Sequence, residues 1–363
     1  MEKKLNTLQM FCIVTCFVKG TTFLVLPSAT VMDAQQFGWL VHLWSLVFGL
    51  GIASLWVYIF DQHPGLSLVQ ICNKVLGRYG GGIVSFCYIL FFIQITAWVT
   101  RNVSDYVHVA MMPRTPSTVI HLSCLVVCAY AVIKGIRVIS LVSVFIVPYV
   151  FVAFWVPFTV MLTEWQWRNF RIPSEFHLWP TIVETKYALG LPFMESIAFM
   201  MIFPLVQGKL KTALLGGTAS AGMQVALSVF FVIGILGVHR ASHLLYPEYT
   251  IFREMVFSNF MEHFESILSV NVLLIVFVKV SVILYCTVTA IAQLFAIRSR
   301  AAITIPLIWV ISAYSLLFAN IGEYMKWIRD YLFAYYLPFG VGFPVLLLVV
   351  HWLKNAGKVA KSA

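Results

Sequence analysis

Two long apolar runs, about half a chain apart, are each interrupted by residues that break helices. Gly20, Thr21 and Thr22 interrupt the first run, and Gly190 and Pro192 interrupt the second. Paired helix interruptions in corresponding halves of a membrane protein indicate a transporter-type binding site near the bilayer midplane. The two breaks therefore predict a membrane protein that binds a small ligand.

The chain carries too much apolar material for a soluble fold. Its 363 residues are 61% hydrophobic and 10% charged, whereas a soluble domain is about 45–50% apolar and about 25% charged. A helix needs ~20 mostly apolar residues to cross a bilayer. We expect one all-helical transmembrane domain over residues 1–363, with ten spans near 7–32, 36–60, 80–103, 115–134, 138–163, 185–206, 212–238, 267–297, 301–320 and 333–353.

The ten predicted spans divide into two halves of five, and the first span of each half carries a break. This pattern matches an inverted-topology repeat, with a first repeat at about 7–163 and a second at about 185–332; the last span, about 333–353, is included in the ten. Ten spans put both termini on one side. That side carries thirteen Lys and Arg residues and the other carries eight, so the positive-inside rule predicts cytoplasmic termini.

Several other classes of function are disfavoured. The net charge of +10 forms no basic stripe along a polar face, which argues against nucleic-acid binding. The seven cysteines form no metal pattern. No serine-hydrolase, phosphate-loop or zinc-protease motif is present. We therefore expect no enzyme, no metal and no cofactor.

The first break offers a site for an anion. An unwound turn at Gly20, Thr21 and Thr22 frees backbone N–H and C=O groups, which survive in a membrane only beside protein or a wet cavity. The N-terminus of the following half-helix would suit a ligand carboxylate. The alternative is that glycine is simply common in membrane helices and that Pro27 ends this one.

Three ionisable residues lie inside predicted spans. Glu195 follows the second break, and an intramembrane carboxylate is by default a functional candidate. It could pair with a ligand ammonium, carry a proton or lock helices together. Lys19 and Lys279 are candidates for ion or proton coupling; the alternatives are a structural ion pair, contact with freed carbonyls, or loss of the proton on burial.

The predicted pocket brings these segments together. Ser281 and Tyr285 are four residues apart and share one helix face, so they either line the pocket or pack as ordinary core. Arg101 is interpreted as an arginine that reaches the interface, and residues 246–265 as a re-entrant lid or surface helix. The full predicted ligand-binding set is Gly20, Thr21, Thr22, Ile95, Thr96, Phe193, Glu195, Ser281 and Tyr285.

A family resemblance emerges from these motifs taken in order. It rests on the first break with Leu26-Pro27, on Leu76-Gly77 with Gly80-Gly81, on Met-Pro-Arg-Thr-Pro at 112–116, on Leu-Pro-Phe-Met-Glu at 191–195, on Tyr246-Pro247-x-Tyr249, and on 260–265. Over nearly its whole length the chain resembles the B subunits of nutrient germinant receptors. These spore germination permeases belong to the amino acid/polyamine/organocation transporter superfamily. One departure is Met194, where the family usually has glycine; the larger side chain predicts a smaller local pocket.

The resemblance implies a LeuT-like fold with broken helices one and six. It also implies a receptor that binds a small nutrient of the amino-acid class, has A-type and C-type partner subunits and lies in the spore inner membrane. The alternative function is a proton-coupled amino acid secondary transporter that uses Glu195 or Lys279. Because a sensor and a permease need the same pocket, the residues alone separate these two functions poorly.

Overall fold

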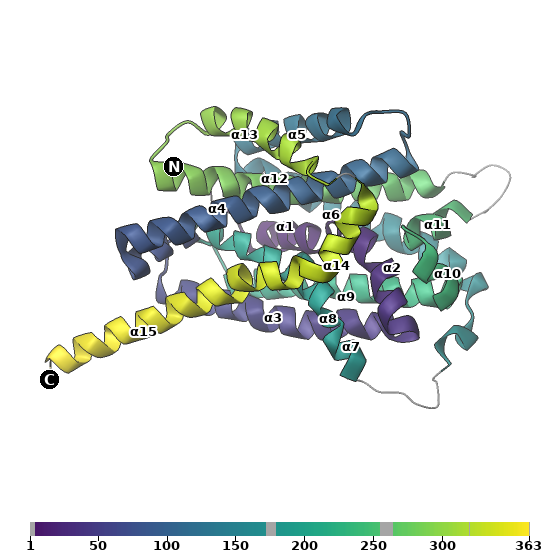
Figure 1. The fold of residues 1–363 in the computed structure, drawn as a ribbon, viewed down its shortest axis with the longest axis horizontal. Helices are drawn as coiled ribbons and strands as arrows, with labels where there is room; N and C mark the ends of the chain where they lie inside the picture. Colours follow the sequence, from purple (N-terminus) through teal and green to yellow (C-terminus); the bar gives the residue numbers. More distant parts are fainter. Residues whose placement is uncertain (1–3, 172–178, 255–263, 319, 363) are drawn as a thin grey trace.

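The computed structural model describes all residues except 1–3, 172–178, 255–263, 319 and 363. The described chain is almost entirely helical, and most long helices run roughly along one direction (Figure 1). Both chain ends lie toward one end of this bundle, which we call the terminal end. Helices α10 and α11 lie at the opposite, distal end (Figure 1).

The elements follow one another with short connections. The first half contains α1 Thr7–Lys19, α2 Thr22–Ala34, η1 Gln35–Phe37, α3 Gly38–Gln62, α4 Leu68–Ala110, α5 Ser117–Lys134, α6 Ile136–Val160, η2 Met161–Glu164 and η3 Trp167–Phe170. The second half contains α7 Trp179–Val183, α8 Thr185–Ala188, η4 Leu189–Phe193, η5 Met194–Met201, η6 Phe203–Leu205, α9 Leu210–Leu236, α10 Val238–His243, α11 Pro247–Glu254, α12 Phe264–Phe295, α13 Arg300–Ser315, α14 Ile321–Leu337, η7 Pro338–Gly342 and α15 Phe343–Ser362.

The helix lengths fit an integral membrane protein. In the described part of the chain, seven helical segments are long and apolar enough to cross a bilayer, and two shorter apolar helices, α1 and α13, accompany them. Their apolar side chains remain exposed on the outside of the bundle, as expected where lipid replaces water. The expected all-helical membrane fold is confirmed, while the count of ten spans stays a prediction.

Two helical segments extend beyond the spans predicted from the sequence. Helix α4 begins at Leu68, where Ser67 caps it, and a kink at Gly77 (φ 80°) separates this first part from the span that was predicted to begin near residue 80. Helix α14 begins at Ile321, ahead of the last span predicted at about 333–353. Residues 321–332 fall between two predicted spans, yet they are helical, and Tyr324 and Leu332 bury one face of that helix.

Both predicted breaks are present in the backbone. Gly20 separates α1 from α2 with φ 23° and ψ −125°, a conformation that glycine accepts far more readily than other residues. In the second break, Leu191 departs from helical geometry and the peptide before Pro192 is cis. Helix α1 packs against both η4 and α12. The two breaks are therefore brought together in the middle of the bundle.

Candidate functional site

A buried ion pair joins the second break to helix α12. The Nζ atom of Lys279 lies 2.6 Å from Oε2 of Glu195, and neither side chain is more than 1% exposed. The hydroxyl of Tyr336 donates a hydrogen bond of 3.3 Å to Oε1 of Glu195. Because each charge has an opposite partner, the pair offsets part of the large cost of burying either group alone.

The same lysine also reaches the first break. A β-carbon at Gly20 would collide with the side chain of Lys279, and it would lie 2.7 Å from the carbonyl oxygen of Phe17. The Nζ atom of Lys279 lies 5.3 Å from the centre of the Phe17 ring. Lys279 thus occupies the space that the missing side chain at position 20 leaves, and it links Gly20 to Glu195.

The space between the breaks is nearly closed in this conformation. A cavity of about 10 Å³, which we call the midplane cavity, is lined by Thr22, Phe193 and five other residues. That volume is close to the minimum for one water molecule. Phe193 fills the surrounding space, because its ring packs directly against Gly49 and Gly222. A ligand can enter here only after Phe193 or a neighbouring helix moves.

The start of α2 carries a buried hydroxyl that is available to a ligand. The hydroxyl of Thr21 is buried and has no hydrogen-bond partner in the described part of the chain. The N–H groups of Leu24 and Val25 bond back to the Thr21 carbonyl, as a helix start requires. A helix N-terminus beside an unpartnered buried hydroxyl is chemically suited to a small anion.

Met194, the departure from the family pattern, does not line the midplane cavity. Its side chain instead packs against Gly340 in η7, where an added β-carbon would lie 2.9 Å from Cγ of Met194. The bulk of this side chain is accommodated by a glycine on a neighbouring element. The sequence expectation of a smaller local pocket therefore finds no support in the contacts of Met194.

The remaining predicted wall residues lie outside the midplane cavity. Ile95 is fully buried, and the hydroxyl of Thr96 bonds to its own helix at Phe92 O (2.7 Å). Ser281 lies beside a cysteine of α5. The ring of Tyr285 lies 5.2 Å from the guanidinium carbon of Arg300, close to the start of α13. A ligand-binding role for these four residues stays a prediction.

Lys19 has different surroundings from Lys279. Its Nζ donates to Oε1 of Gln224 (3.1 Å) and lies 3.9 Å from the centre of the Phe154 ring. Of these two lysines, Lys279 is therefore the one that forms the ion pair with Glu195.

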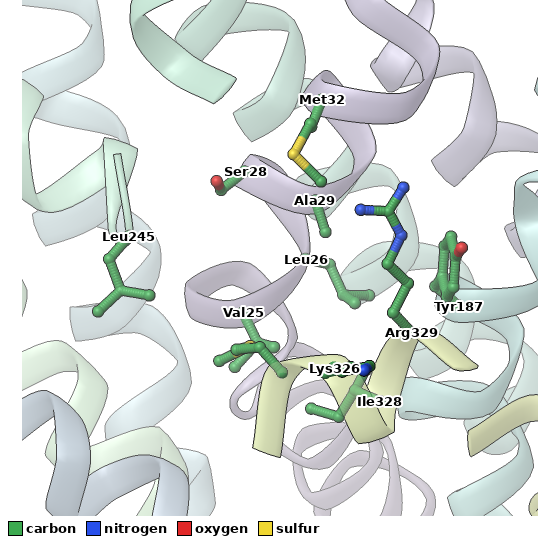
Figure 2. A pocket seen from close by; sticks show the side chains of 11 residues that line it. Val25, Leu26, Ser28, Ala29, Met32, Tyr187, Leu245, Lys326, Ile328 and Arg329 are labelled. Carbon is green, nitrogen blue, oxygen red and sulfur yellow. The ribbon is translucent and has the colours of Figure 1, made fainter. Parts of the chain in front are cut away.

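A larger cavity, which we call the distal cavity, lies between α2, α8 and α14 (Figure 2). Its volume is about 350 Å³, within the range of sites for small molecules. Its floor is apolar, and the guanidinium of Arg329 and the hydroxyl of Tyr187 lie on one side of it (Figure 2). Arg329 also pairs with Asp33 (2.6 Å), which ties α14 to the end of α2.

The distal cavity was not predicted from the sequence, because residues 321–332 fall between the spans predicted at 301–320 and 333–353. The signal was nevertheless present. Tyr324, Ile328 and Leu332 recur four residues apart, which is typical of a helix with one buried face. On such a helix Met325 and Arg329 share a neighbouring face, and both line the cavity.

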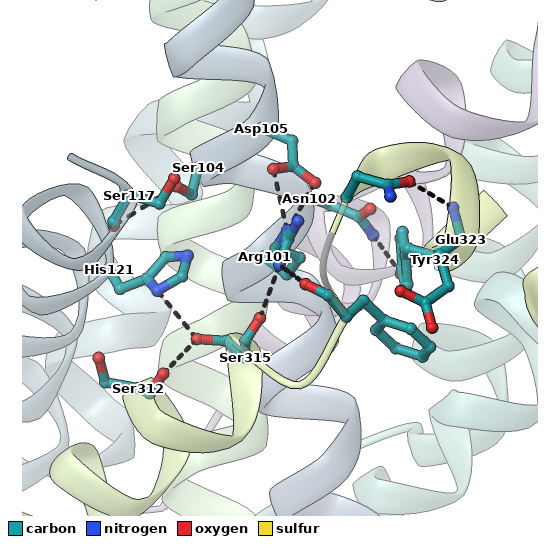
Figure 3. A network of polar contacts seen from close by, with 12 residues as sticks. Arg101, Asn102, Ser104, Asp105, Ser117, His121, Ser312, Ser315, Glu323 and Tyr324 are labelled. Atoms are coloured by element: carbon teal, nitrogen blue, oxygen red, sulfur yellow. Dashed lines mark hydrogen bonds and ion pairs between the residues drawn. The ribbon is translucent and has the colours of Figure 1, made fainter. Parts of the chain in front are cut away.

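Arg101 anchors a polar network rather than reaching the interface (Figure 3). Its guanidinium pairs with Asp105 (2.8 Å) and donates to the carbonyl oxygens of Ser315 (3.2 Å) and Phe318 (2.9 Å). The hydroxyl of Ser315 in turn contacts Nδ1 of His121 (2.9 Å). The expected snorkelling arginine is thus wrong, because carbonyls left free at the end of α13 offer Arg101 better partners than the interface.

Part of the predicted lid is a short helix docked on the distal end. Helix α11 buries Glu248 completely, and the hydroxyl of Ser228 donates to its Oε1 (2.9 Å). Burial raises the pKa of Glu248 to about 8. This part of the lid fits the surface-helix interpretation, while residues 255–263, including most of the family-like motif at 260–265, lie outside the described residues.

Comparison with known proteins gives this fold and site a context. The sequence profile of the family described as spore germination protein matches residues 4–324. Spore germination protein KB of Bacillus subtilis (strain 168) is 26% identical over 99% of this chain and 98% of its own length. Spore germination protein B2 of the same organism is 24% identical over 74% of each chain.

Solved structures confirm the LeuT-type transporter fold. A Na⁺-coupled sialic acid symporter in a substrate-bound, outward-open state matches with a TM-score of 0.65 and 11% identity, over 92% of this chain and 77% of that one. MhsT in complex with L-phenylalanine matches with a TM-score of 0.58 and 11% identity, over 97% and 99%. At these identities the likeness concerns the fold alone.

Proposed function

The chain belongs to the spore germination protein family, and from that premise we propose that it is the membrane subunit of a nutrient germinant receptor. The subunit binds a small nutrient of the amino-acid class and triggers germination together with partner subunits. The observation that carries this proposal is the buried Glu195–Lys279 pair, placed where two broken helices meet.

The proposed ligand site uses both breaks. The ligand carboxylate meets the N-terminus of α2 and the unpartnered hydroxyl of Thr21. In the closed state Lys279 already neutralises the Glu195 carboxylate. The ligand ammonium must therefore compete with Lys279 for Glu195. Because the ligand carries one charge of each sign, the Lys279 ammonium that it displaces from Glu195 pairs with the ligand carboxylate beside Gly20.

Ligand binding requires the closed site to open. The midplane cavity of about 10 Å³ holds no nutrient, whereas the distal cavity of about 350 Å³ has room for one. We place ligand entry through the distal cavity, with separation of Asp33 from Arg329 releasing α2 from α14. A ligand that binds the open state more tightly than the closed state shifts the population between them, and partner subunits respond to that shift.

The proposed location is the spore inner membrane, with cytoplasmic termini. The excess of Lys and Arg on the terminal side supports this orientation. The proposed partners are A-type and C-type receptor subunits. Affinity purification of the tagged chain from spore membranes should recover an A-type subunit, and full germination activity of the lone chain in a foreign membrane would count against the receptor assignment.

A secondary transporter is the second candidate, because solved structures with this fold include a Na⁺-coupled symporter. In that case Glu195 or Lys279 carries a proton between the two sides. Uptake of labelled amino acids into proteoliposomes, measured beside ligand binding and with or without a pH gradient, separates the two functions. Binding without accumulation supports the receptor, and accumulation driven by the gradient supports the transporter.

A further inference from the structure

A second sizeable cavity lies on the flank of the bundle, where α1 packs against α6, α9 and α12. We call it the side cavity. Its volume is about 340 Å³, and it shares no lining residue with the distal cavity or the midplane cavity. Neither the proposed nutrient site nor the proposed entry route uses it.

The side cavity opens on a surface that faces lipid. Phe151 and Val152 line it and are 51% and 59% exposed. Both lie near the middle of α6, a helix of 25 residues that is long enough to span a bilayer. At that depth the surroundings are hydrocarbon rather than water. An occupant therefore arrives from the lipid phase and is mostly apolar.

The deep end of the side cavity holds a buried cation. Lys19 lines it and is 2% exposed. The Nζ atom has three hydrogens to donate, and it donates one to the neutral amide oxygen of Gln224 (3.1 Å). The amide nitrogen of Gln224 is turned away, toward Ser220 O (3.2 Å).

Lys19 has no carboxylate partner within the described residues. Every described ion pair involves other cations, and Glu195, the carboxylate of the second break, is taken by Lys279. A buried ammonium without a counter-charge is costly, and the contact with the Phe154 ring offsets only part of that cost. The side cavity thus joins an uncompensated cation to an apolar wall and a lipid-facing mouth.

We propose that the side cavity binds a carboxylate amphiphile from the bilayer, of the fatty-acid class. Its carboxylate pairs with Nζ of Lys19, and its tail runs along Val147 and Phe151 toward the mouth. A carboxylate is the small anionic head that fits a single cation at this depth, and its protonated form can reach the midplane as a neutral molecule. A phospholipid head group has to remain near the interface.

A fatty acid bound at Lys19 also affects the first break, because Lys19 adjoins it. Lys19 is the last residue of α1 and directly precedes Gly20, where the first break begins. An anion bound at Nζ of Lys19 therefore acts on the same unwound turn that faces the proposed nutrient site. A fatty acid bound in the side cavity therefore shifts the conformation of the unwound turn at Gly20.

The test uses dodecanoate that carries a diazirine near the end of its tail, applied to the full chain in lipid nanodiscs. We expect crosslinks to the α6 peptide that contains residues 147–152. Unlabelled dodecanoate should displace the label, and dodecanol, which lacks the charge, should not. Lys19→Met should weaken labelling by about tenfold or more, as expected for the loss of a charge-assisted contact. The matched control Lys211→Met, at an exposed lysine on α9, should label as the wild type does.

A second variant tests the cavity without changing Lys19. Val152→Trp fills the mouth from its lipid-facing side, so it should abolish labelling while the chain remains folded. The proposal is overturned if dodecanol competes as well as dodecanoate, or if Lys19→Met and Val152→Trp both label normally. Crosslinking of a diazirine-bearing amino acid to residues 147–152 would also overturn it, because a water-borne nutrient would then occupy the cavity.

Discussion

The Nζ atom of Lys279 lies 2.6 Å from Oε2 of Glu195, and this contact joins helix α12 to the second broken helix. Glu195 belongs to the second break, and the Lys279 side chain fills the space at Gly20 in the first. One buried pair therefore holds both unwound segments in the closed state. A ligand that separates the pair changes both segments together.

The energetic coupling of this pair can be measured. Glu195→Gln and Lys279→Met each leave one buried charge without its partner, which typically costs about 3–5 kcal/mol. The double variant leaves neither charge, so its unfolding temperature should lie above those of both single variants. Thermal unfolding of the purified proteins checks this. Strictly additive losses in the double variant would show that the two side chains are not coupled.

The Asp33–Arg329 contact should affect entry of the nutrient more than the thermal stability of the fold. Arg329 is 47% exposed in this pair, and exposed ion pairs contribute only about 0–1 kcal/mol. We expect Arg329→Asp to leave the unfolding temperature nearly unchanged and to shift the nutrient concentration that gives half-maximal germination. The charge swap Asp33→Arg with Arg329→Asp should restore the wild-type concentration. Failure of the swap to do so, with normal protein abundance, would remove this pair from the entry route.

Docking of α11 should depend on pH through Glu248. Burial raises the pKa of this carboxyl to about 8, whereas an exposed glutamate has a pKa of about 4.3. Between these two pH values the Glu248 carboxyl is protonated when α11 is docked and ionised when it is undocked. The docked state is thus at full stability below that ordinary value and loses stability as the pH rises toward about 8. Hydrogen exchange of residues 247–254 should increase over this range. Glu248→Gln should show a flat profile; a wild-type profile that is equally flat would contradict the assignment.

The predicted orientation can be tested by labelling. Lys211 at the terminal end and Arg253 on α11 are both exposed. Single cysteines at these positions, in a cysteine-free background, should react with a membrane-impermeant maleimide from opposite sides. With cytoplasmic termini, position 253 is labelled in intact cells and position 211 only after permeabilisation. Labelling of both positions from one side would refute the topology.

The sequence predicted the features that depend on local chemistry. Both breaks were visible because glycine and proline at positions 20 and 192 disturb long apolar runs. The intramembrane charges at Glu195 and Lys279 stood out for the same reason. The membrane fold and the family followed from these features and were confirmed. The repeat boundaries and the ligand-binding set stay predictions.

The features that sequence reasoning missed depend on tertiary contacts. Which lysine pairs with Glu195 is decided by how α1 and α12 pack, and residue spacing carries no such information. Arg101 was assigned to the interface because the free carbonyls at Ser315 come from a distant segment. The distal cavity was missed because the first part of α14 fell between two predicted spans. In each case the deciding partner lies more than 80 residues away in the chain.

The most direct test of the central claim compares two glycine variants in spores. Gly20→Val places a branched side chain where Lys279 and the Phe17 carbonyl lie, whereas at Gly51 an added β-carbon meets no atom within 4 Å. We predict that Gly20→Val abolishes the germination response to amino acids at normal membrane abundance and that Gly51→Val retains it. An unchanged amino-acid response of abundant Gly20→Val protein would contradict nutrient binding at the paired breaks.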